Sequence, residues 1–189
     1  KLPLFKMLLE HVMNAKISLN DSEFKLGDIS KDDKLPEMEF YFSVDRVNKT
    51  IINELLSEDT KLGGEIDNEG LMTGFIDLVF KHNGKYYILD WKSNHLGNSV
   101  DNYDMAGMET AMTGSNYHLQ YKIYTVALIR WLKSRISDFD YEKHFGGIIY
   151  VFLRGVRKGS DTGIYTSLPD KNEIDDLDKA FRGELQEAD

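Results

Sequence analysis

Two aspartates and a lysine in the middle of the chain have the types and the spacing that metal-assisted hydrolysis of a phosphodiester would use. Twelve residues separate Asp77 from Asp90, and Lys92 follows Asp90 by two positions. Side chains two apart on a strand share one face, so Asp90 and Lys92 would lie side by side. Carboxylate oxygens are the ligands that Mg²⁺ prefers, and the ion lowers the pKa of a water bound to it. The neighbouring ammonium would help to position or deprotonate that water.

The sequence around these residues predicts a β-hairpin that brings the two aspartates together. Runs 71–81 and 85–92 are rich in β-branched and aromatic residues, and the Asn-Gly dipeptide between them favours a type I′ turn. With these two residues at the centre of the turn, Asp77 falls opposite Asp90, with Cβ atoms about 4.5–5.5 Å apart. Like charges repel in an apolar hairpin, so we expect a divalent cation between them. The alternative is an edge hairpin whose bent strands hold the carboxylates apart.

The remaining hydrophobic periodicity predicts an α/β domain in which helices pack on a central sheet. We expect helices over 1–16, 47–57, 102–113 and 117–135, strands over 37–45 and 146–154, loops over 17–36 and 58–70, and a charged helix or tail over 172–189. The run 146–154 is apolar throughout, which is typical of a strand buried on both faces. Without repeats or an internal linker, the sequence predicts one domain over 1–189, with its core over 37–168.

Composition excludes several classes of protein. The 189 residues include no cysteine, which excludes disulfide frameworks, zinc–thiolate sites, iron–sulfur clusters and cysteine nucleophiles. A formal net charge of −9 argues against a non-specific nucleic-acid binder, which usually carries a basic surface. With no apolar run long enough for a bilayer and no secretory signal, we expect a cytoplasmic protein without a membrane partner. Because the first residue is Lys1, we also expect a piece of a longer chain.

The sequence words around the two aspartates resemble the PD-(D/E)xK nuclease superfamily and, within it, the nuclease domains of the RecB family. The resemblance rests on GFIDLVF at 74–80, YYILDWKSNHLG at 86–97, HLQYKIYTVAL at 118–128 and FGGIIYVFLRG at 145–155. It is close from about residue 35 to about residue 168 and weaker outside this range. The resemblance implies a restriction-endonuclease-like fold, in which helices flank a central mixed β-sheet.

The resemblance also implies roles for single residues at the strand end. Asp77 and Asp90 match the metal-binding acids of the family, and Lys92 matches its catalytic lysine. The main-chain carbonyl that follows the second acid, here that of Trp91, also reaches the metal in this family. The implied cofactor is Mg²⁺.

Further residues are implied around this centre. Gln120 and Tyr124 match the family's Gln-x-x-x-Tyr motif, and their i, i+4 spacing places both on one helical face, where they would hold the substrate or the site. Glu37 matches an upstream acidic position, and Glu39, two residues later, is an alternative. The family's metal-binding histidine lies upstream in a Gly-rich context that is not found here. His11 is expected to be a surface or packing residue, so we expect an incomplete metal shell and weak or absent activity of this chain alone.

Two further groups of residues have two interpretations each. Tyrosines at helical spacing would either stack on bases or belong to the core; they are Tyr117, Tyr121 and Tyr124. Basic residues flank the last apolar strand and would either meet phosphate or form a solvated rim; they are Lys143, Arg154, Arg157 and Lys158.

The function implied by the resemblance is that of a Mg²⁺-dependent DNA exonuclease domain of the exodeoxyribonuclease V type. It would work in a RecBCD-type helicase–nuclease during double-strand break repair and recombination. The implied partners are linear double- and single-stranded DNA, RecC- and RecD-type subunits, and RecA. One alternative is a catalytically idle nuclease fold that docks partner proteins, although such a module would not need opposed carboxylates in an apolar hairpin. Another is a standalone restriction-type endonuclease, which the net charge disfavours.

Overall fold

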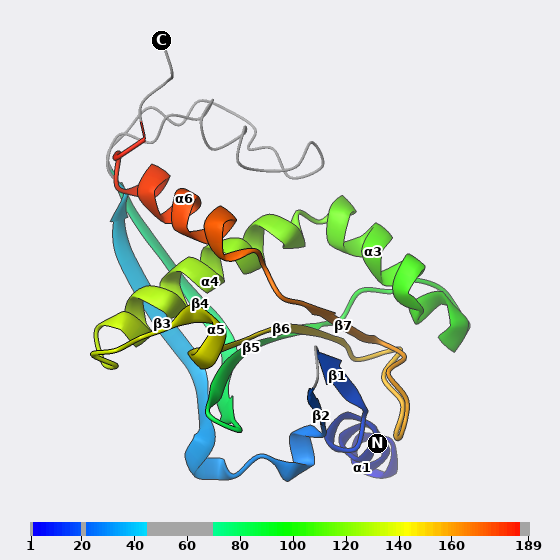
Figure 1. The fold of residues 1–189 in the computed structure, drawn as a ribbon. Coiled ribbons are helices and arrows are strands. Elements are labelled where there is room, and N and C mark those ends of the chain that lie inside the picture. Colours follow the sequence, from blue (N-terminus) through cyan, green and yellow to red (C-terminus); the bar gives the residue numbers. More distant parts are fainter. Residues whose placement is uncertain (1, 20–21, 45–69, 186–189) are drawn as a thin grey trace.

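The computed structural model describes residues 2–19, 22–44 and 70–185. The predicted helix over 47–57 and all but the last residue of the predicted loop over 58–70 lie outside these ranges. At the centre is a five-stranded sheet in the order β3-β4-β5-β6-β7 (Figure 1). Its strands are β3 (Lys34–Val44), β4 (Gly70–His82), β5 (Lys85–Lys92), β6 (Phe145–Phe152) and β7 (Ile164–Ser167). Strands β5 and β6 are parallel and the other pairs antiparallel, which confirms the predicted mixed sheet.

Helices and a small hairpin cover the two faces of this sheet (Figure 1). One face carries α3 (Met105–Gly114), α4 (Tyr117–Lys133) and α6 (Lys171–Phe181), and the other carries α1 (Leu2–Met13) with β1 (Ile17–Leu19) and β2 (Ser22–Phe24). The short helix α5 (Tyr141–His144) leads into β6. Of the described helices, none is both long and apolar enough to span a membrane.

Strand β6 is the centre of the hydrophobic core. All eight of its residues are buried, as the apolar run predicts. Ile148 and Tyr150 pack in the cluster on the α4 face, whereas Ile149 and Val151 pack in the cluster on the α1 face. Strand β6 pairs in parallel with β5 up to Lys92, so the end of β5 lies beside buried residues of β6.

The turn between β4 and β5 has the conformation that its sequence predicts. Asn83 and Gly84 have φ values of 48° and 83°, and a type I′ turn requires positive φ at both central positions. The register follows: His82 pairs with Lys85, and the ladder continues to Leu78 opposite Leu89. The predicted hairpin register is therefore confirmed over this length.

Strand β4 changes faces at Asp77. Ile76 packs in the cluster on the α4 face, but Leu78, which a regular strand would place on the same side, packs in the opposite cluster. The neighbouring β3 is irregular at the same register position, because Glu37 has a φ of 49°, a value uncommon for residues other than glycine. Beyond this point β4 pairs with β3 and no longer with β5 in the described ladder. Asp77 therefore lies at the fork between two strands.

Two parts of the prediction were wrong. The expected loop over 17–36 contains the β1–β2 hairpin, two 3₁₀ turns and the start of β3. Strand β7 was not expected at all, and each of these missed strands has only three or four residues, too few to show a clear alternation. The segment expected to be a charged helix or tail is largely the amphipathic helix α6, which buries Ile174, Leu177 and Phe181 against the core.

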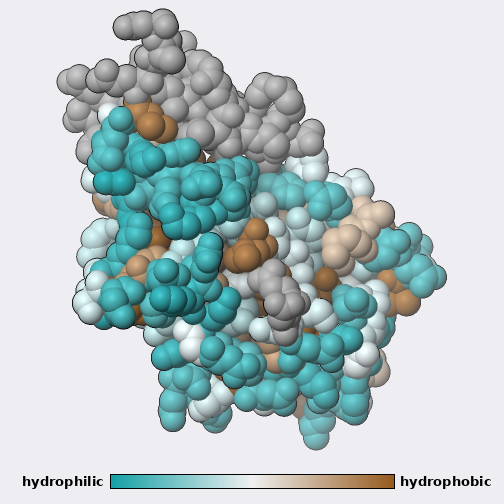
Figure 2. Space-filling model, in the orientation of Figure 1, coloured by the Kyte–Doolittle hydropathy of each residue, from teal (hydrophilic) through white to brown (hydrophobic). Residues whose placement is uncertain are grey.

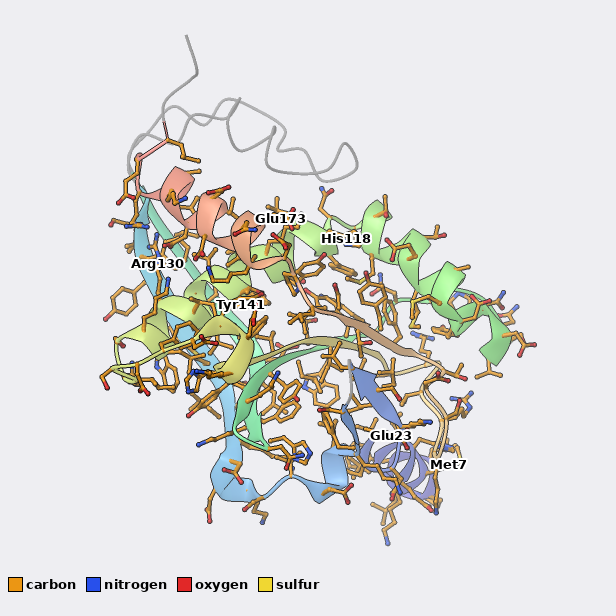
Figure 3. All side chains as sticks on the ribbon, in the orientation of Figure 1. Met7, Glu23, His118, Arg130, Tyr141 and Glu173 are labelled. Atoms are coloured by element: carbon orange, nitrogen blue, oxygen red, sulfur yellow. The ribbon has the colours of Figure 1, made fainter. Side chains whose placement is uncertain are left out.

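Ion pairs fix α6 to α4 along their shared side (Figure 3). Arg130 Nε lies 2.5 Å from Asp178 Oδ1, and Lys122 pairs with Glu173. The outer side of α6 is charged, and the surface over this helix in Figure 2 is hydrophilic. The charged residues that made the segment look like a tail are thus the exposed side of a packed helix.

We predict that Leu177→Ala lowers the free energy of unfolding by about 2–4 kcal/mol, because it removes a side chain that is 1% exposed and leaves a cavity. Urea unfolding followed by circular dichroism measures the change. Lys179→Ala, on the exposed side of the same helix, is the matched control and should alter stability by less than about 0.5 kcal/mol. Equal, small effects of both substitutions would show that α6 contributes little to the core.

Candidate active site

The predicted pair Asp90 and Lys92 lies at the end of β5 and is buried, with exposed fractions of 4% and 7%. Lys92 Nζ is 2.6 Å from Asp90 Oδ2. Ile88, two residues earlier on the strand, packs in the cluster below α4. The structure therefore places Asp90 and Lys92 on one face, beneath α4, as their spacing predicts.

The ammonium of Lys92 has a second polar partner and two aromatic neighbours. Nζ donates to Gln120 Oε1 at 2.8 Å. It also lies 3.7 Å from the ring centre of Tyr117 and 4.8 Å from that of Tyr150. The electron-rich ring faces attract a cation, which offsets part of the hydration that burial removes.

Gln120 connects this lysine to two tyrosines. Its Oε1 also accepts the hydroxyl of Tyr150 at 3.0 Å, and its Nε2 donates to the hydroxyl of Tyr124 at 3.0 Å. Burial raises the pKa of Tyr124 to about 12, and the charge of Asp90 adds to this, so the phenol stays protonated. The predicted pair Gln120 and Tyr124 thus shares one helical face and contacts the site through Lys92.

Asp77 reaches β5 through its side chain. Its Oδ2 accepts the main-chain N–H of Trp91 at 2.8 Å. The described β4–β5 ladder ends one position earlier, so the carboxylate takes the place of a strand carbonyl at the fork. The carboxylate of Asp77 is thereby held against the peptide group between Asp90 and Trp91.

Burial dominates the electrostatics of Asp90. Removal from water raises the pKa of its carboxyl, the hydrogen bond and charge of Lys92 lower it, and the nearby charge of Asp77 raises it again. The pKa of Asp90 lies above its ordinary value as a result. Asp77 and Asp90 do not pair in the described ladder, which ends at Leu78 opposite Leu89, so their direct opposition stays a prediction.

The oxygen donors at this fork suit a hard divalent cation. Asp77 and Asp90 supply carboxylate oxygens, and Asp77 contacts the main chain of Trp91, the residue that follows Asp90. Among the residues that the structure describes, no group of three or more histidine, aspartate or glutamate side chains gathers at one place. His11 accepts the N–H of Lys158 at its Nδ1, 3.0 Å away, so it serves in packing as expected.

Glu37 and Glu39 are not brought into contact with these groups. Glu37 occupies the irregular register position opposite Asp77 and is exposed. Glu39 pairs with Phe75 and is exposed on the side of β3 away from the α4-side core. The structure thus gives neither glutamate a polar partner within the site, and Glu37 keeps only its position beside Asp77.

Sequence reasoning missed Tyr150, and of its two interpretations for Tyr117 the structure supports packing against the core. Tyr150 is fully buried in β6, pairs with Asp90 in the parallel ladder and orients Gln120. Tyr117 covers Lys92 and donates its hydroxyl to Asn94 Oδ1 at 3.1 Å. A polar tip in an otherwise aliphatic and aromatic strand, GGIIYVF, is the signal that would have identified Tyr150.

The basic residues around β6 do not form one cluster. Lys143 lies in α5, before the strand begins, whereas Arg154 and Arg157 follow its end. Lys158 pairs with Glu10 of α1 at 2.6 Å. Only the two arginines therefore lie near the end of β5.

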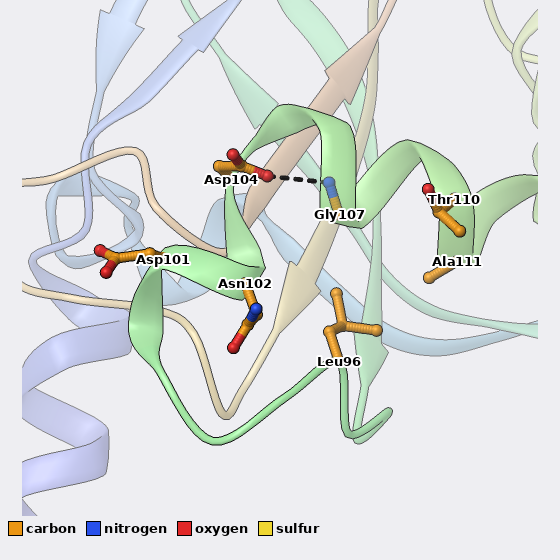
Figure 4. A pocket seen from close by; sticks show the side chains of 7 residues that line it. All are labelled: Leu96, Asp101, Asn102, Asp104, Gly107, Thr110 and Ala111. Atoms are coloured by element: carbon orange, nitrogen blue, oxygen red, sulfur yellow. Dashed lines mark hydrogen bonds between the residues drawn. The ribbon is translucent and has the colours of Figure 1, made fainter.

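Two further acids lie at the start of α3, where one of them caps the helix (Figure 4). Asp101 and Asp104 line a cleft of about 420 Å³ at the start of α3. Asp104 Oδ1 accepts the N–H of Gly107 at 2.8 Å, as an N-cap residue does. Asp101 accepts the hydroxyl of Ser99 at 3.0 Å. These carboxylates are accounted for by the start of the helix.

The comparisons with known proteins agree with this geometry. Residues 15–189 match the family described as the PD-(D/E)XK nuclease superfamily. The chain belongs to this superfamily. The predicted restriction-endonuclease-like fold is confirmed, and the relatives described below show that the chain is a RecB-like member.

Several similar proteins carry the description RecBCD enzyme subunit RecB. The one from Escherichia coli (strain K12) is 42% identical over 179 residues, which cover 90% of this chain and 15% of that protein. The one from Haemophilus influenzae is 36% identical over 181 residues, covering 92% of this chain and 15% of that protein. The one from Mycobacterium tuberculosis (strain H37Rv) is 35% identical over 132 residues, covering 65% and 12%. This chain thus spans about 15% of the length of its first relatives.

We predict that Gln120→Leu lowers the free energy of unfolding by about 1–3 kcal/mol, because it removes the 3.0 Å acceptor of the buried Tyr150 hydroxyl and leaves the ammonium of Lys92 with Asp90 as its one remaining side-chain acceptor. Adding Tyr150→Phe removes one stranded donor and should restore part of the loss. Urea unfolding of the wild type, both single variants and the double variant measures the coupling. Strictly additive effects would contradict the network.

Proposed function

We propose that this chain is a Mg²⁺-dependent nuclease domain that hydrolyses DNA phosphodiester bonds at the fork between β4 and β5. Membership of the nuclease superfamily supports the class of reaction, and the contacts of Asp77 with Trp91 and of Asp90 with Lys92 support this place for it. The observation that carries the proposal is the buried Lys92, held between Asp90 and Gln120 at 2.6 Å and 2.8 Å.

The residues of the chain would share the work as follows. Asp77, Asp90 and the carbonyl of Trp91 would hold the cation, which supplies Lewis-acid stabilisation of phosphate charge and a more acidic water. Lys92 would stabilise negative charge at the reacting phosphate and orient the attacking water. Gln120, Tyr150 and Tyr117 would keep the ammonium pointed at that place.

The longer assembly follows from the relatives. Their description names a RecBCD enzyme, so we propose that the domain acts as the exonuclease of such a helicase–nuclease during double-strand break repair and recombination. Its partners would be linear DNA and RecC- and RecD-type subunits. The expected contact with RecA has no support among the described residues and is not part of this proposal.

A docking module with an idle site is the second candidate. Burial of a lysine and an aspartate is expensive, and the same volume filled with apolar side chains would serve packing equally well or better. Retention of both charged groups, with Asp77 beside them, favours catalysis.

We predict that Lys92→Gln lowers the single-turnover rate of linear DNA cleavage in Mg²⁺ by at least about 100-fold. Asp90→Asn should remove cleavage, because the carboxylate contributes both to the cation site and to the position of Lys92. Lys85→Gln is the matched control: it removes a lysine from the other end of β5 and should leave the rate within about twofold of wild type.

The measurement is made on the complete RecBCD-type enzyme, because weak or absent activity is expected of this chain alone. It uses end-labelled single- and double-stranded DNA with Mg²⁺, with Ca²⁺ and with a chelator. Cleavage that persists in Asp90→Asn or in the chelator would place the chemistry elsewhere. Folded variants are verified by circular dichroism before rates are compared.

A further inference from the structure

Two arginines beside the candidate site have no acidic partner among the residues that the structure describes. The loop between β6 and β7 carries Arg154, which is exposed, and Arg157, which is half-buried. Within the described parts of the chain, no carboxylate lies within salt-bridge distance of either guanidinium, whereas Arg130 and Arg182 both pair with Asp178. Arg135 contacts Trp131 and Ser134 beyond the end of α4, whereas Arg154 and Arg157 lie together on the loop that follows β6.

The structure holds Arg154 against the end of the strand that carries Lys92. The N–H of Leu153 donates to the carbonyl of Lys92 at 2.9 Å, and Arg154 Nε donates to the carbonyl of Ser93 at 2.9 Å. Arg157 is held in turn by the carbonyls of Arg154 and Val156. Each guanidinium thus uses part of its donors on main chain, and Arg154 keeps both terminal nitrogens for another acceptor.

Tyr103 makes this loop a rigid support. Its hydroxyl accepts the N–H of Leu96 at 3.2 Å, which fixes the segment after β5, and its carbonyl accepts the N–H of Gly163 at 3.0 Å, which fixes the loop before β7. A Cβ on Gly155 would lie 2.3 Å from the ring of Tyr103, so only glycine permits this close packing. The two loops that flank the strand end are therefore locked together.

We infer that Arg154, supported by Arg157, binds a backbone phosphate of the substrate strand next to the bond that is cleaved. A planar guanidinium with two free N–H₂ groups matches two phosphate oxygens. The net charge of −9 makes such a local contact necessary, because the field of the whole chain repels DNA. This inference rests on the proposed nuclease function and gives the site its contact with the strand on the β6 side.

The test measures binding of a fluorescent single-stranded oligonucleotide to the 189-residue chain by anisotropy, in the Asp90→Asn background with Ca²⁺, over a range of salt concentrations. Arg154→Gln should weaken binding about tenfold and reduce the slope of log Kd against log salt by about 0.7. Arg154→Lys should keep the slope and lose part of the affinity. Arg135→Gln, which removes an exposed arginine beyond the opposite end of α4 from Gln120, should change neither.

A neutral phosphate in the DNA tests the same contact without altering the protein. A methylphosphonate is placed at each phosphate of the oligonucleotide in turn. At one of these positions it should weaken binding to the chain that keeps Arg154 about tenfold. Methylphosphonate at that position should not weaken binding to Arg154→Gln any further. If this variant does not fold, the same methylphosphonate should weaken binding to Arg154→Lys by less than about tenfold. Equal losses in Arg154→Gln and Arg135→Gln, or a salt slope unchanged in Arg154→Gln, would overturn the inference and point to an acidic protein partner.

The proposed function and this inference fail separately. Cleavage retained by Asp90→Asn contradicts the site, while the binding data still decide the role of Arg154. In the catalytically competent chain, Arg154→Gln should raise KM about tenfold with kcat within about twofold of wild type, because the phosphate contact is present before and during the reaction.

Discussion

The buried ammonium of Lys92 is the constraint on which the site and much of the packing around it depend. A charge removed from water is tolerated only when it is paired and hydrogen-bonded. Here Asp90 supplies the opposite charge and Gln120 a second hydrogen-bond acceptor for the ammonium. The ring faces of Tyr117 and Tyr150 lie against its remaining sides. These groups come from β5, α4 and β6, so α4 has to dock on the sheet at one depth and one rotation. The position of the helix and the geometry of the site are consequently the same structural fact.

A second constraint is the irregularity at Asp77, where the side chains of β4 change from one face of the sheet to the other. A continuous ladder between β4 and β5 would satisfy the N–H of Trp91 with a strand carbonyl. The ladder between β4 and β5 ends at Leu78 on the side of Asp77. The carboxylate of Asp77 therefore accepts that N–H instead. The fork therefore aims a carboxylate of one strand at the backbone of the next, beside Asp90. The same departure lets β3 and β4 continue as a separate two-stranded ribbon and places the positive φ of Glu37 at the bend.

Local chemistry made the hairpin predictable, and distance in the sequence made the rest of the site less so. The two turn residues, Asn83 and Gly84, determine the register by themselves, and the register brings Asp77 near Asp90. The fork was not visible, because it depends on which core each strand residue meets. Tyr150 lies 30 residues from Gln120, and only packing of α4 on β6 joins them. The missed strands β1, β2 and β7 are too short to carry a periodic signal and form because the sheet and its neighbours offer them partners.

The same surroundings of Lys92 bear on how a cation and an ammonium can share one carboxylate. Asp77, Asp90 and Lys92 carry two negative charges and one positive charge, a formal sum of −1. The three groups together therefore attract a divalent cation. Asp90 would help to hold it, and Lys92 already contacts one oxygen of that carboxylate at 2.6 Å. A cation that took this oxygen would weaken one contact of the ammonium. Gln120 and the ring of Tyr117 would still hold Nζ, at 2.8 Å and 3.7 Å. The amide and the aromatic faces thus allow Asp90 to turn toward a cation while Lys92 stays beside it, which is the arrangement that hydrolysis of a phosphodiester needs.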